Sequence, residues 1–99
     1  MSFHLTAKAK ADVKEIGRYT QKKWGRDQRN HYLQKIDDAF HHLAQNPDKG
    51  RDCADIRPGY QKYGIGKHFI FYRVTKVRHI EIVRVLHGRM NIEQRLTEN

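Results

Sequence analysis

The first half of the chain carries two apolar patterns with the helical period, and only a short turn separates them. The first runs from Thr6, which is an acceptable N-cap, to Trp24, and Gly25 supplies its stop. The second runs from Asp27 to Gln45 and ends at Asn46 and Pro47. Apolar residues recur every three or four positions in the first pattern, at Ala9, Val13, Ile16, Thr20 and Trp24. Two helices joined by so short a turn should pair as an antiparallel hairpin.

The second half of the chain changes to β-type segments. Residues 47–59 hold Pro, Gly and Asp without periodicity and predict a loop. Three strands are predicted after it, at Tyr60 to Ile65, Lys67 to Thr75 and Ile80 to Leu86. Their connections are short enough for hairpins, so the sheet should be antiparallel, with a short strand at Phe3 to Leu5 joining it. The tail from Asn91 to Asn99 is a short helix or disordered.

These elements predict an α+β fold in which an N-terminal helical hairpin packs on one face of a small antiparallel β-sheet. With 99 residues, we expect one domain spanning residues 1–99. Cys53 is the only cysteine, which excludes an intramolecular disulfide and favours a reducing compartment. Because no apolar run has the roughly 20 residues that a spanning helix needs, and the start lacks a signal-peptide core, we expect a cytoplasmic protein without membrane contact.

The strongest compositional signal is charge. Twenty Lys and Arg against eleven Asp and Glu give a formal net charge of +9, which favours polyanionic partners such as nucleic acid, a protein working on it, or an acidic polypeptide. On the first helix, four cations stand four residues apart on the side away from the apolar face, namely Lys10, Lys14, Arg18 and Lys22. This stripe is either a solvated face or a docking surface for DNA or an acidic protein.

Three arginines interrupt the apolar sequence of the predicted sheet. Arg84 should form a structural ion pair, whereas we expect Arg57 and Arg73 to face a ligand. Strand alternation sets Phe69, Phe71 and Arg73 on one face and Ile70, Tyr72 and Val74 on the other. Helices should cover only one of these faces, so a partner segment, or RNA bases stacked on the aromatic rings, would cover the other.

Histidine is the remaining candidate for chemistry. His87 stands where the last strand stops, with His68 nearby on the adjacent strand, and an imidazole there could act as a general acid or base. No nucleophilic relay is evident, so a structural role is favoured. The other histidines lack the ligand spacing typical of zinc, and we expect neither a metal nor a cofactor; they are His4, His31, His41, His42 and His79.

Nearly the whole chain resembles the ParE branch of the RelE/ParE toxins. The motifs that carry this resemblance are Leu5-Thr6, Tyr19-Thr20, Trp24-Gly25, Ala39-Phe40, Asn46-Pro47, Ile56-Arg57-Pro58-Gly59-Tyr60, Phe71-Tyr72-Arg73-Val74 and the last strand with its His87-Gly88-Arg89 ending. The resemblance implies the hairpin-on-sheet fold, neutralisation by a ParD-like antitoxin, and poisoning of DNA gyrase without chemistry of its own. DNA would be contacted only indirectly, through gyrase or the antitoxin.

RelE-type members share the fold but cut messenger RNA on the ribosome. Phe69 follows His68 where a nuclease relative would carry a catalytic Arg, and Gly88 follows His87 where such relatives have Tyr, and these two departures argue against RNA cleavage. His87 itself matches the nucleases, so RNA cleavage with His87 as its catalytic residue is the alternative. A non-toxic basic nucleic-acid-binding module is the second alternative.

Candidate sites follow from this interpretation. The expected antitoxin contact comprises Arg57, Tyr60, Phe69 and Arg73. The expected gyrase contact is the helix stripe of Lys10, Lys14, Arg18 and Lys22 together with the tail from Arg89 onward.

Overall fold

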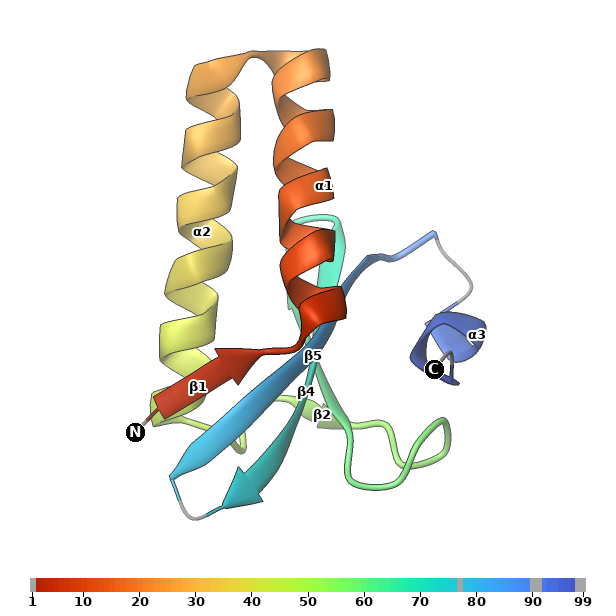
Figure 1. Cartoon of the computed structure of the whole chain (residues 1–99). Helices are drawn as coiled ribbons and strands as arrows, with labels where there is room; N and C mark the ends of the chain where they lie inside the picture. Colours follow the sequence, from red (N-terminus) through yellow and green to blue (C-terminus); the bar gives the residue numbers. More distant parts are fainter. Residues whose placement is uncertain (1, 77, 90–91, 98–99) are drawn as a thin grey trace.

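The computed structural model describes residues 2–76, 78–89 and 92–97 and has helices on both faces of one sheet. The hairpin consists of α1 (Ala7–Trp24) and α2 (Arg26–Gln45). The strands are β1 (Ser2–Leu5), β2 (Arg51–Asp52), β3 (Gln61–Ile65), β4 (His68–Lys76) and β5 (His79–His87), and α3 (Ile92–Thr97) follows them. Within the described residues the strand order is β1-β5-β4-β3-β2 (Figure 1).

The α+β fold class is confirmed, with one change in the sheet. β3, β4 and β5 pair antiparallel as expected and β2 adds antiparallel to β3, but β1 pairs parallel with β5 and makes the sheet mixed. The direction of β1 follows from its connection, because it leads directly into α1, which lies beside the same strand. The loop predicted for residues 47–59 also contains the short strand β2, whose two residues carry too little pattern to be recognised.

Local signals explain the hairpin. The Thr6 hydroxyl caps α1 by accepting from the Ala9 amide at 3.0 Å. Gly25 has φ +95°, a backbone conformation that residues with a side chain disfavour. It is the single residue between the end of α1 and the start of α2. Gly17 lets the helices approach closely, since a Cβ there would lie 3.1 Å from a methyl group of Leu33.

The principal core lies between the hairpin and the sheet. It is made of residues from α1 as far as position 16, the second half of α2 and the helix-facing side of β4 and β5: Ala9, Ile16, Ile36, Ala39, Phe40, Leu43, Ala44, Ile70, Tyr72, Ile80, Ile82 and Val85. No helix among the described residues is long and apolar enough to cross a membrane.

The opposite sheet face has its own small core, which corrects the expectation that the chain leaves this face uncovered. Phe71 and Leu86 pack there against Cys53 from the loop and Leu96 from α3. Phe69 lies in this cluster while Ile70 and Tyr72 lie in the principal core, so the predicted alternation along β4 is confirmed. The loop and α3 therefore cover part of the sheet face that we had expected a partner to cover.

Asp12 on α1 holds the hairpin to the sheet. Its carboxylate accepts two hydrogen bonds from the Arg84 guanidinium, at 2.8 and 2.9 Å, and one from the Val85 amide at 3.0 Å. The Arg84 and Asp12 side chains are only 11% and 13% exposed, so the expected structural ion pair of Arg84 is confirmed. β1 pairs with β5 only as far as Ile82, and beyond that point Thr6 and Asp12 satisfy the edge of β5.

Asp12→Ala should lower the free energy of unfolding by about 3 to 5 kcal/mol, because it leaves the buried Arg84 cation without its carboxylate. Denaturant unfolding followed by circular dichroism measures this change. The control is Glu15→Ala on the same helix, which breaks the exposed Glu15–Arg18 pair and should cost less than about 1 kcal/mol. Equal losses in the two variants would show that Asp12 is not an anchor.

Candidate functional site

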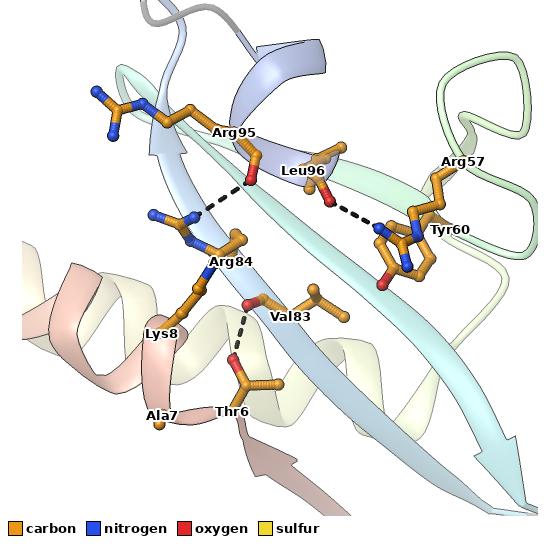
Figure 2. A pocket seen from close by; sticks show the side chains of 9 residues that line it. All are labelled: Thr6, Ala7, Lys8, Arg57, Tyr60, Val83, Arg84, Arg95 and Leu96. Atoms are coloured by element: carbon orange, nitrogen blue, oxygen red, sulfur yellow. Dashed lines mark hydrogen bonds between the residues drawn. The ribbon is translucent and has the colours of Figure 1, made fainter. Parts of the chain in front are cut away.

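A cavity of about 320 Å³ opens where α1, β5, the loop before β3 and α3 converge (Figure 2). Its wall includes Lys8, Arg57, Arg84 and Arg95, so four of its nine lining residues are cationic. The remaining lining residues are Thr6, Ala7, Tyr60, Val83 and Leu96. The side chains of Lys8, Arg57 and Arg84 and the ring of Tyr60 give the cavity a basic, partly aromatic wall.

Two of these arginines hold α3 in place. Nη1 of Arg57 donates to the Leu96 carbonyl at 3.1 Å, and Nη1 of Arg84 donates to the Arg95 carbonyl at 3.3 Å (Figure 2). The Arg57 guanidinium also lies 5.4 Å from the centre of the Tyr60 ring, within cation–π range. The Arg95 side chain points away from the cavity, which leaves Lys8 beside the bonded arginines (Figure 2).

The structure brings the predicted antitoxin-contact residues to one sheet face. Tyr60 and Phe69 pack on the small core there, and Arg73 on β4 pairs with Glu81 of β5 at 2.7 Å. Arg57 and Arg73, which we expected to face a ligand, each also have a partner within the chain. A partner on this face would meet arginines that are held in fixed orientations, which reduces the entropy cost of binding them.

The predicted gyrase-contact residues fall into two separate places. Lys10, Lys14, Arg18 and Lys22 are all exposed along α1, and among them Arg18 pairs with Glu15 at 2.9 Å. Arg89 is exposed just after β5. The stripe is therefore accessible as predicted, whereas most of the tail proposed with Arg89 belongs to α3 or lies outside the described residues.

His87 and His68 are the two histidines that the sequence marked as candidates for chemistry. They are opposite each other on β5 and β4, with ring centroids 5.2 Å apart. Nδ1 of His87 accepts a hydrogen bond from the Arg89 amide at 3.0 Å, and Nδ1 of His68 shares one with the Tyr32 hydroxyl at 2.7 Å. Burial, reinforced by the neighbouring His87, lowers the pKa of His68 to about 4. His68 is therefore neutral at pH 7 and contributes no cation to this pair.

Sequence reasoning missed a polar chain on the outer strands. The Ser2 hydroxyl bonds Nδ1 of His79 at 2.6 Å, Nε2 of His79 bonds His4 at 2.6 Å, and His4 bonds Glu81 at 2.9 Å. Burial raises the pKa of Glu81, but hydrogen bonds from Arg73 and His4 outweigh it and leave that pKa lowered. The parallel register of β1 on β5 creates this chain, and nothing in the sequence predicts that register.

No metal centre accompanies these histidines in the described part of the chain. Groups of three or more His, Cys, Asp or Glu side chains that could hold an ion are absent there.

Comparison with known proteins places these features in a family context. Residues 3–92 match the family described as the ParE toxin of the type II toxin-antitoxin system parDE. The chain is 45% identical over 92 residues to Toxin ParE1 of Mycobacterium tuberculosis, covering 93% of this chain and 94% of the relative. It is 36% identical over 94 residues to Toxin ParE1 of Caulobacter vibrioides, covering 95% and 96%.

A solved structure described as the chromosomal ParDE TA system from P. aeruginosa superposes with a TM-score of 0.76 at 24% identity. The match covers 88% of this chain and 95% of the other. It supports the fold described above.

His68 predicts a pH dependence of stability. The unfolded chain protonates His68 near pH 6.5, whereas the folded chain does so only near pH 4. Because the unfolded state binds more protons between these values, stability should fall as the pH drops from 6.5 to 4. In His68→Gln the dependence should be shallower by up to about 1.4 kcal/mol per pH unit. Denaturant midpoints across this range measure it, with the exposed His31→Gln as control, and an unchanged slope in His68→Gln would refute the assignment.

Proposed function

Because this chain belongs to the ParE toxins of type II toxin-antitoxin systems, we propose that it acts by binding DNA gyrase and trapping the complex of gyrase with cleaved DNA. A cognate ParD-like antitoxin neutralises it. Gyrase poisoning and neutralisation by the antitoxin both depend on protein binding, and the toxin itself makes or breaks no covalent bond. It contacts DNA only indirectly, through gyrase or the antitoxin.

The observation that carries this proposal is the distribution of cations. The lysines of the α1 stripe are exposed and available to an acidic surface, whereas the arginines of the sheet face are engaged inside the chain. A nuclease would need cations gathered around a reacting phosphate. Arg57 and Arg84 do lie at one cavity, but there they bond α3 and Asp12, and the ring neighbour of His87 is the neutral His68.

The antitoxin contact is proposed for the sheet face opposite the hairpin. Tyr60 and Phe69 are partly buried there and offer aromatic surface, and Lys62 lies 5.3 Å from the centre of the Phe69 ring. Arg57 and Arg73 flank these rings with charge. An antitoxin segment that carries both apolar side chains and carboxylates fits this mixture, since interfaces combine aromatic anchors with a polar rim.

Purified toxin added to gyrase, supercoiled plasmid and ATP should cause linear DNA to accumulate after detergent and protease treatment. His87→Ala should leave this activity intact. The double variant Lys14→Glu/Arg18→Glu should weaken it roughly tenfold, a loss of about 1.4 kcal/mol of attraction to an acidic surface.

The matched control is Lys35→Glu/Lys49→Glu, which makes the same change in net charge at exposed positions outside the stripe. Its activity should equal that of the wild type. If gyrase ran unaffected while His87→Ala abolished messenger RNA cleavage on translating ribosomes, the gyrase proposal would be replaced by the nuclease alternative.

A further inference from the structure

The end of the helical hairpin projects beyond the sheet and carries two large aromatic side chains that are exposed. Residues 18–31, all of which the structure describes, include no buried residue, and the turn at Gly25 lies at the top of Figure 1, clear of the strands. Tyr19 and Trp24 lie here and are 53% and 64% exposed. The sequence pattern had set Trp24 on the core side of α1, and this prediction is wrong because the sheet does not extend that far.

A lysine joins the two exposed rings into one patch. Nζ of Lys23 lies 5.7 Å from the centre of the Tyr19 ring and 5.8 Å from that of Trp24, and it donates to the Tyr19 hydroxyl at 3.3 Å. We call Tyr19, Lys23 and Trp24 the hairpin-end patch. Cation–π contacts at exposed sites contribute about 0.5 to 1 kcal/mol each, so the rings are partly ordered before any partner arrives.

The surroundings of the patch are strongly basic. Residues 18–31 contain five Lys or Arg and one acidic residue, Asp27. Arg18 and Lys22 continue the α1 stripe directly into this end of the molecule, and Arg26 begins α2 beside it. The hairpin end thus combines exposed Trp and Tyr side chains with Arg and Lys side chains. Trp, Tyr and Arg are the residue types that most often dominate the binding energy of protein–protein interfaces.

A protein partner fits this surface better than a nucleic acid does. Single-stranded nucleic acid binds along grooves where bases stack on free ring faces. The hairpin end is instead a projection, and Lys23 already lies over both rings. A projecting Trp surrounded by cations complements an apolar pocket with carboxylates at its rim.

We propose that the hairpin-end patch is the main anchor on gyrase, with Trp24 entering an apolar pocket of gyrase whose rim is acidic. This inference rests on the proposed function and moves the centre of the contact from the middle of the α1 stripe to the end of the hairpin. The stripe then supplies attraction at the edge of the interface, and Trp24 supplies the desolvated contact at its centre.

The test measures the affinity of the full-chain toxin for purified gyrase, together with linear DNA release, in Trp24→Ser and Trp24→Phe. Trp24→Ser should weaken both at least about tenfold, and Trp24→Phe should retain most of the affinity because it keeps an aromatic ring. The control is Val74→Ser, which changes a large hydrophobic residue of the described chain that is also highly exposed, at 50%, but lies outside the patch, on β4. It should match the wild type.

Different failures have different meanings. Wild-type affinity in Trp24→Ser, with gyrase poisoning intact, would overturn the patch and leave the proposed function standing. A wild-type toxin that does not bind gyrase would overturn both. Loss of affinity in Trp24→Ser for a labelled single-stranded or duplex oligonucleotide, or for the antitoxin, with gyrase binding unchanged, would assign Trp24 to that other partner and overturn the inference.

Discussion

The Asp12 carboxylate is the contact on which the arrangement of the whole molecule depends. β1 is too short to pair with all of β5, and Asp12 satisfies the Val85 amide that would otherwise lack a partner at this edge. The same carboxylate neutralises Arg84, which in turn donates to the Arg95 carbonyl. One side chain therefore connects the hairpin, the central part of the sheet and α3.

This anchor lies in the first half of α1, whereas no residue of the hairpin between positions 18 and 31 is buried. The molecule consequently has two different surfaces for partners. The sheet face around Tyr60 is bounded by arginines that already have partners, whereas the hairpin end around Trp24 has exposed rings and cations. We infer that the two surfaces divide the work, with the sheet face serving the antitoxin and the hairpin serving the target.

The sequence predicted correctly those features that depend on residue patterns within a single helix or strand. Helical periodicity and Gly25 were sufficient for the hairpin, and Arg84 in a central strand correctly indicated a buried ion pair. The errors concern relations between distant segments. The parallel pairing of β1, the cover that Leu96 supplies and the exposure of Trp24 all depend on where elements end relative to one another. Periodicity gives the orientation of a residue on its helix but not how far the neighbouring sheet reaches.

The division between the two surfaces is tested most directly by photocrosslinking from single positions. A photoreactive phenylalanine analogue would replace Trp24 in one toxin and Tyr60 in another, and each would be irradiated with gyrase or with the cognate antitoxin. The account predicts that position 24 crosslinks to gyrase and position 60 to the antitoxin. Crosslinks to gyrase from position 60, with none from position 24, would contradict it.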